Sequence, residues 1–149
     1  MASSIPLASL GARPDIAQKI QELLLPEYDL VHICLNPDTA IAELPAVCAG
    51  GGSSSGAADL APPSSGLGSN AARPAAERRA PRGIIFGAGI SDGDVTRVMD
   101  AVKKEAPETK VVRVTREAIL AAGAQMPNPE IITKVLREIL AGMVEKGEL

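Results

Sequence analysis

Aromatic residues are almost absent from this 149-residue chain, which has no tryptophan and only Tyr28 and Phe86. These two rings offer little surface on which nucleic-acid bases or a flavin could stack. Basic residues are not in excess either, because 15 Lys and Arg stand against 18 Asp and Glu, mixed along the chain. We therefore expect no nucleic-acid partner, since binding a phosphate backbone requires a basic surface.

Cysteine and histidine are also scarce. Cys34 and Cys48 do not form a CxxC pair, and His32 is the single histidine. These are too few ligands for a structural zinc site and too few cysteines for a disulfide scaffold, so we predict no metal and a reducing, cytoplasmic location. No run approaches the roughly 20 apolar residues of a membrane helix, and the first ten residues have no basic region typical of a signal peptide. We expect no membrane association.

Residues 1–48 are predicted to form a first β-α-β-α half. The apolar spacing predicts a strand at 5–9, a helix from Pro14, a fully buried strand at 28–35, and a short helix from Asn36 that Pro45 bends or ends. From 49 to 82 the composition changes to Gly, Ser, Ala and Pro, which predicts a disordered linker. Four arginines near its end are interpreted as part of a solvated tail rather than as contacts to an acidic partner: Arg73, Arg78, Arg79 and Arg82.

Residues 83–149 are predicted to form a second β-α-β-α half. A strand at 84–86 precedes a helix whose start is marked by Ser91 and Asp94, and a strand at 110–115, expected near a sheet edge, precedes a last helix from Asn128. The broad apolar stripe of that helix either packs on the sheet or forms the face of a homodimer.

Alternating strands and helices predict one α/β domain built from both halves, with a small four-stranded, mainly parallel sheet, flanking helices and right-handed crossovers. Rossmann-like and flavodoxin-like strand orders both fit this pattern. Ligands of such sheets bind at the carboxyl ends of the strands.

Gly11 and Arg13 follow the first predicted strand, where a helix amino terminus can hold a phosphate or a carboxylate. The alternative is a tight turn with a solvated arginine.

The loop after the third strand resembles a dinucleotide-binding fingerprint, although its spacing is GxGxxxG. Its candidate residues are Gly87, Gly89, Ser91 and Gly93. Arg116, after the next strand, would favour NADP through the ribose phosphate. Asp92 and Asp94 oppose this interpretation, because they satisfy the helix dipole themselves and would repel an anion. A capped turn with permissive glycines is the alternative.

Catalytic motifs are missing: the sequence has no Tyr-x-x-x-Lys pair, no GxSxG elbow and no GxxxxGK[ST] loop. His32 is interpreted as a buried, hydrogen-bonded histidine. If it acts as a general base, Asp92 is the expected partner across the sheet end. Cys34 is expected to be a small buried hydrophobe.

Two segments, LASLGARPDIAQKIQELLLPEYDLVH and RGIIFGAG, resemble short Rossmann-like proteins of filamentous fungi without an established activity, some of which are encoded beside secondary-metabolite enzymes. The resemblance implies no catalytic residues. It is consistent with a non-catalytic accessory protein that binds a small anionic ligand or a partner protein in a biosynthetic pathway. The alternative is a minimal NADP-dependent oxidoreductase that acts as an oligomer.

Overall fold

A computed structural model describes residues 4–11, 13–25, 27–49, 63–74, 77–87, 89–123 and 128–149. The strands in these residues are β1 (Ile5–Leu10), β2 (Tyr28–Cys34), β3 (Gly83–Phe86) and β4 (Lys110–Arg113). The helices are α1 (Pro14–Leu24), α2 (Pro37–Cys48), the 3-10 turn η1 (Ser69–Ala71), α3 (Asp92–Glu105), α4 (Arg116–Ala121) and α5 (Pro129–Glu145). The predicted α/β class is confirmed.

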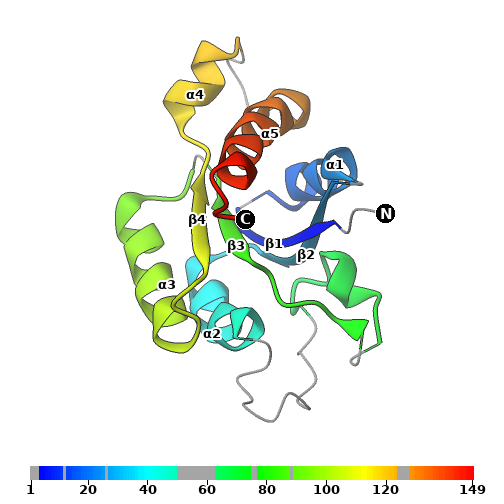
Figure 1. Cartoon of the computed structure of the whole chain (residues 1–149), viewed down its shortest axis with the longest axis vertical. Coiled ribbons are helices and arrows are strands. Elements are labelled where there is room, and N and C mark those ends of the chain that lie inside the picture. Colours follow the sequence, from blue (N-terminus) through cyan, green and yellow to red (C-terminus); the bar gives the residue numbers. More distant parts are fainter. Residues whose placement is uncertain are drawn as a thin grey trace.

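The described strands form one parallel sheet in the order β2-β1-β3-β4 (Figure 1). This order matches the flavodoxin-like arrangement, in which the third strand pairs with the first. A Rossmann order would place the third strand beside the second, so that alternative is wrong. β4 lies at one edge of the sheet, as its alternating sequence predicts.

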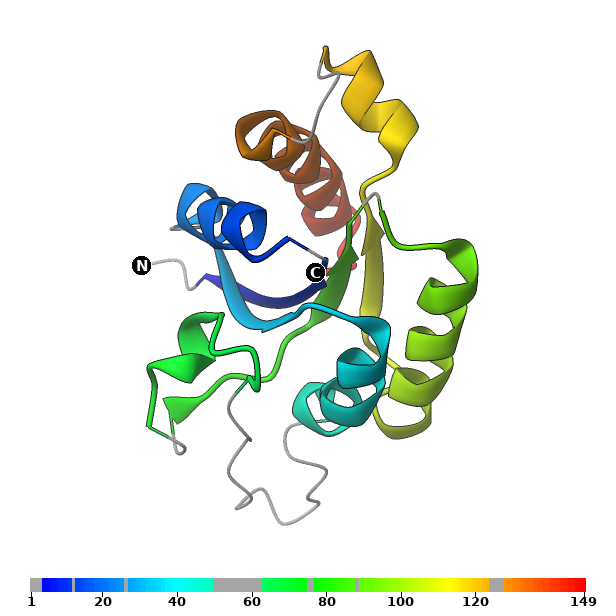
Figure 2. The ribbon, with the colours of Figure 1, turned by 180° about the vertical axis from the view of Figure 1, so that it is seen from behind.

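Helices cover both faces of the sheet. α1 packs with α5 on one face, and α2 packs with α3 on the other (Figures 1 and 2). The core under α1 and α5 includes Leu7, Leu30, Ile85 and Leu136, and the core under α2 and α3 includes Leu10, Leu44, Phe86 and Val98. The apolar stripe of α5 therefore packs largely on the sheet and on α1, and its use as a homodimer face stays a prediction.

A bulge in β2 decides which side chains face which layer. The register against β1 shifts after Leu7 and leaves Val31 outside the pairing. Leu30, before the bulge, contacts the core under α1 and α5, whereas Cys34, after it, contacts the core under α2 and α3. His32 lies two residues before Cys34 and so points to the same face.

The outer edge of β2 is covered by a segment that we call the strap, residues 63–74 and 77–82 (Figure 1, green). The Ile33 N–H donates to the Leu67 carbonyl at 3.3 Å, and the Ser65 hydroxyl donates to the Ile33 carbonyl at 2.5 Å. Gly68, with φ of +105°, approaches so closely that a Cβ there would lie 2.5 Å from the Val31 carbonyl oxygen. The strap therefore supplies partners to a sheet edge that would otherwise be open.

The expectation of a disordered linker at 49–82 does not describe the strap, where Asn70 is fully buried and exchanges hydrogen bonds with the backbone of Arg79. Residues 50–62 of that predicted linker lie outside the described residues. The interpretation of the four arginines of this segment as a solvated tail is also wrong for two of them. Arg73 and Arg79 donate to the buried carboxylate of Asp29 at 2.7 and 3.1 Å, and Ser69 donates to its other oxygen at 2.5 Å.

Helix starts are where the sequence predicts them. The side chains of Asn36, Ser91 and Asn128 accept backbone N–H groups in the first turns of α2, α3 and α5. Pro45 lies inside α2, which continues to Cys48, so the proline does not end that helix. α4 was not predicted. None of the described helices has the length and apolar character needed to cross a membrane.

Candidate functional site

The carboxyl ends of β1 and β3 form the point at which the strand order reverses. The chain leaves β1 toward α1 on one face and leaves β3 toward α3 on the other (Figure 2). Gly11 and Gly87 meet there, because the Gly87 N–H donates to the Leu10 carbonyl at 3.0 Å and a Cβ on Gly87 would lie 3.8 Å from the Gly11 Cα. Two candidate loops of the sequence are thus neighbours at the position where open α/β sheets bind ligands.

The glycines at this edge are not required by the fold. Gly11 and Gly89 do not have a positive φ, and a Cβ on either would meet no atom within 4 Å. Glycine there leaves the backbone of Gly89 exposed and that of Gly11 partly exposed without a local structural reason. Such exposed backbone suits close approach by a ligand.

The amino terminus of α1 begins beside Gly11 and is held differently from the other described α-helices. Arg13 is its N-cap residue and provides no side-chain cap, whereas α2, α3, α4 and α5 each have one. The Arg13 guanidinium instead binds the Asp15 carboxylate, with N–O distances of 3.1 and 3.3 Å. This guanidinium, assisted by the Ile16 backbone N–H, lowers the pKa of Asp15. The Asp15 carboxylate is therefore an oxyanion that this helix start already binds. Both side chains of the Arg13–Asp15 pair are exposed to solvent.

The amino terminus of α3 is closed by its own residues. The Ser91 hydroxyl accepts the Asp94 N–H at 3.2 Å. The two carboxylates of the first turn are paired with arginines, Asp92 with Arg113 and Asp94 with Arg97. Because a pyrophosphate would have to displace the serine and approach two carboxylates, this turn is a poor site for a dinucleotide.

Gly93 and Arg116, assigned to the pyrophosphate and the ribose phosphate of NADP, lie after the neighbouring strands β3 and β4. Gly93 lies in the first turn of α3, and Arg116 is the exposed first residue of α4 beyond the end of β4. Among the described residues no hydrogen bond joins Arg116 to the loop after β3. The candidate ribose-phosphate contact stays a prediction.

His32 is fully buried, as predicted, but its partner is not Asp92. Its Nε2 lies 2.7 Å from the Glu43 Oε1 on α2, whereas Asp92 binds Arg113 at the sheet end. Burial lowers the pKa of His32 despite the opposing effect of Glu43. A neutral imidazole without access to solvent is not placed to act as a general base on a substrate at the sheet edge. The Asp92 partnership is therefore wrong.

Cys34 is completely buried, in agreement with the sequence interpretation. Burial raises the pKa of its thiol to about 12, so it is protonated at neutral pH. A protonated thiol is a poor nucleophile.

Glu43 was missed by the sequence interpretation, because it lies in a helix and no spacing motif connects it to His32 eleven residues earlier.

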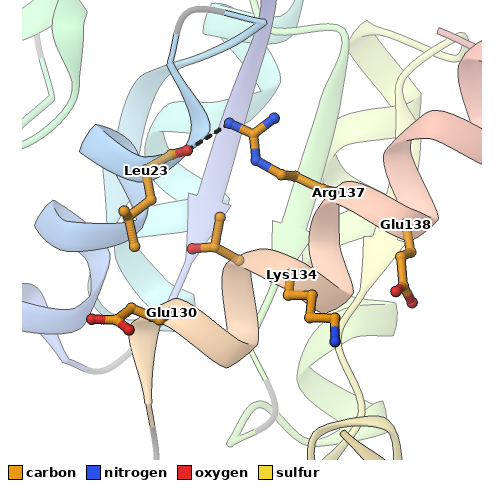
Figure 3. A pocket seen from close by; sticks show the side chains of 6 residues that line it. Leu23, Glu130, Lys134, Arg137 and Glu138 are labelled. Atoms are coloured by element: carbon orange, nitrogen blue, oxygen red, sulfur yellow. Dashed lines mark hydrogen bonds between the residues drawn. The ribbon is translucent and has the colours of Figure 1, made fainter.

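A shallow groove of about 360 Å³ runs between the end of α1 and α5, lined by Leu23, Glu130, Thr133, Lys134, Arg137 and Glu138. Figure 3 shows that Arg137 reaches toward Leu23, to whose carbonyl it donates at 2.6 Å, while Lys134 and Glu138 point away from this contact. Arg137 also pairs with Glu27. Arg137 thus holds α5 on the end of α1. The charged side chains that line the groove do not converge on a common point.

Comparison with known proteins gives one distant similarity. The chain is 27% identical over 110 residues to "Kojic acid related protein 6" of Aspergillus oryzae, an alignment that covers 74% of this chain and 57% of that protein. The chain thus spans little more than half the length of this relative. No protein-family model matches the chain, and no solved structure does.

Proposed function

We propose that this chain is a non-catalytic accessory α/β protein of fungal secondary metabolism that binds a small anionic ligand at the start of α1. The pathway is inferred from the relative, whose name connects it with kojic acid. The observation that carries the ligand class is the Asp15 carboxylate, held by Arg13 beside the point where the strand order reverses.

The Asp15 carboxylate occupies the place that we assign to the carboxylate or phosphate of a ligand. The pair between Asp15 and Arg13 is exposed, so water and salt compete with it and a better oxyanion can displace it. A ligand there would gain the Arg13 guanidinium and the backbone N–H groups of Asp15 and Ile16, which now face the Asp15 carboxylate. A non-catalytic role is supported by the burial of the His32 and Cys34 side chains, which keeps both from contact with solvent.

Thermal unfolding tests the proposal with inorganic phosphate, a sugar phosphate, citrate, ATP, NADH and NADPH as probes at constant ionic strength. A probe at ten times its dissociation constant stabilises the folded chain by about 1.4 kcal/mol and raises the midpoint by about 3–5 °C. Arg13→Ala should abolish the shift, and Asp15→Asn should enlarge it by removing the internal competitor. Lys19→Ala, which removes the same charge further along α1, is the matched control and should leave the shift unchanged.

Three results would count against this function. Without a shift for any probe, anion binding is refuted. A shift that persists in Arg13→Ala moves the site away from α1. A shift that only NADPH causes and that Arg116→Ala abolishes supports the oxidoreductase alternative, for which the geometry gives no specific observation.

A further inference from the structure

Three potential metal ligands converge inside the fold, under α2 and on the face of the sheet opposite to α1. His32 and Cys34 are alternate residues of β2 and point to the same face, and Glu43 reaches them from α2. One ligand atom of each residue lies within 4.8 Å of the others. A strand that provides two ligands and a helix that provides a third form a set fixed by the fold rather than by a mobile loop.

The backbone around this cluster is held on both sides. The Cys34 carbonyl accepts the Gly11 N–H at 3.1 Å, and Ile33 is hydrogen-bonded to the strap on the outer edge of β2. The Ser64 N–H of the strap also lies 3.4 Å from the Glu43 carboxylate. The side chains of His32 and Cys34 are therefore preorganised, and Glu43, whose side chain is 19% exposed, connects the cluster to the surface.

One ring nitrogen in the cluster has no structural explanation. The Nδ1 of His32 is buried and has no hydrogen-bond partner among the described residues. An unsatisfied buried polar atom costs about 1–3 kcal/mol, and a phenylalanine or leucine would fill the same space without this cost. A metal bound through Nε2, the nitrogen that faces Glu43, would account for a histidine here, with Nδ1 left protonated and without a partner among the described residues.

We propose that His32, Cys34 and Glu43 bind a divalent transition metal of the Zn²⁺ class, with three protein ligands and a fourth position on the Glu43 side for water or a small ligand. Imidazole, thiolate and carboxylate together are a donor set that suits Zn²⁺ and Co²⁺. On binding, the Cys34 S–H bond breaks, a metal–sulfur bond forms and the proton passes to solvent.

The distances allow this with small side-chain movements. Tetrahedral ligands at the usual zinc bond lengths lie about 3.3–3.6 Å from one another. The contact between His32 and Glu43 must open from 2.7 Å, and the wider separations must close from at most 4.8 Å. Rotation of the partly exposed Glu43 side chain can adjust the two separations that involve its carboxylate.

Cobalt titration of the reduced, full-length chain tests the site, because a thiolate ligand gives Co²⁺ an intense charge-transfer band in the near ultraviolet. We expect saturation at one Co²⁺ per chain, displacement by Zn²⁺, and a higher thermal midpoint with the metal. Cys34→Ala should abolish the band, and Glu43→Gln, which keeps a hydrogen bond to His32, should lower the affinity by more than about 100-fold, since loss of a supporting partner alone costs 10–100-fold.

Cys48→Ala is the matched control, because it removes the other thiol of the chain and should leave band and affinity unchanged. Glu43→Gln alters a partly exposed side chain, so the test does not depend on the folding of the Cys34 variant. The site is refuted if Co²⁺ produces no thiolate band, if the band survives Cys34→Ala, or if Glu43→Gln binds as tightly as the unchanged chain. In that case the cluster is a buried hydrogen bond beside an inert thiol.

Discussion

Gly68→Ala should detach the strap from β2. The backbone of Gly68, with φ of +105° and ψ of 152°, lies in a region that is essentially restricted to glycine, and an alanine there costs about 1–3 kcal/mol. Its Cβ would also lie 2.5 Å from the Val31 carbonyl oxygen and 2.9 Å from the His32 backbone nitrogen. Because these are backbone atoms of a strand, the strap has to move away.

That movement breaks the two hydrogen bonds between the strap and Ile33, at about 1 kcal/mol each. Together with the backbone strain, the free energy of unfolding should fall by about 3–5 kcal/mol, which is a large part of the usual 5–15 kcal/mol. The thermal midpoint should fall by roughly 6–20 °C.

Gly66→Ala is the matched control, because Gly66 also has a positive φ, of +75°, but a Cβ there meets no atom within 4 Å. It should cost only about 1–2 kcal/mol. Urea unfolding of both variants measures the difference, and limited proteolysis shows whether the strap is released. Equal losses in the two variants would refute the argument that the strap is packed on β2.

Two further predictions concern pH. Burial alone would raise the pKa of Asp29, but the Ser69 hydroxyl and the Arg73 guanidinium hold it below its ordinary value of 3.8. The ionised Asp29 therefore stabilises the fold above about pH 4, and this contribution is lost as the pH falls through the pKa of Asp29 in the folded chain. Asp29→Asn should therefore be less stable than the unchanged chain at pH 7, and the gap in urea-unfolding free energy should narrow toward pH 3. Burial lowers the pKa of His32, the single histidine, so the unfolded chain takes up that proton first, and stability should decline as the pH falls below about 6.5. His32→Gln should remove this decline between pH 7 and 5, and an unchanged slope would contradict it.

The regular part of the fold could be predicted because local signals and packing agree there. Asn36, Ser91 and Asn128 cap helices where their side chains and spacing indicate, and β2, whose mostly apolar sequence does not alternate, is buried on both faces. Pro45 lies inside α2 although a proline in a helix is unfavourable, because Leu44 and Val47 on either side of it are buried in the core.

The strap could not be predicted from composition. Small polar residues and glycine usually indicate disorder, but here Gly68 is needed for close approach and Asn70 for two backbone hydrogen bonds. The ion pairs of Arg73 and Arg79 with Asp29 span 44 and 50 residues, and no local pattern indicates such distant partners. The same holds for Glu43, which sequence spacing does not connect to His32 and Cys34.

The sequence indicates two glycine loops as candidate binding elements, and their use as a site stays a prediction. The positions of Gly11 and Gly87 follow from the rule that ligands bind where the strand order reverses, but the strand order itself decides that these two loops are neighbours. At the fingerprint-like glycines before α3, the Ser91 cap and the two carboxylates that the sequence already sets against a dinucleotide occupy the first turn, and dinucleotide binding there stays a prediction. The pair between Arg13 and Asp15, two residues apart, was not expected from the sequence.

A two-dimensional amide NMR titration with inorganic phosphate and a sugar phosphate tests the anion site most directly. The account predicts saturable shifts of the amides of Gly11, Asp15, Ile16 and Gly87, which Arg13→Ala abolishes and Lys19→Ala leaves in place. Saturable shifts confined to residues 89–94, or none at the start of α1, would contradict it.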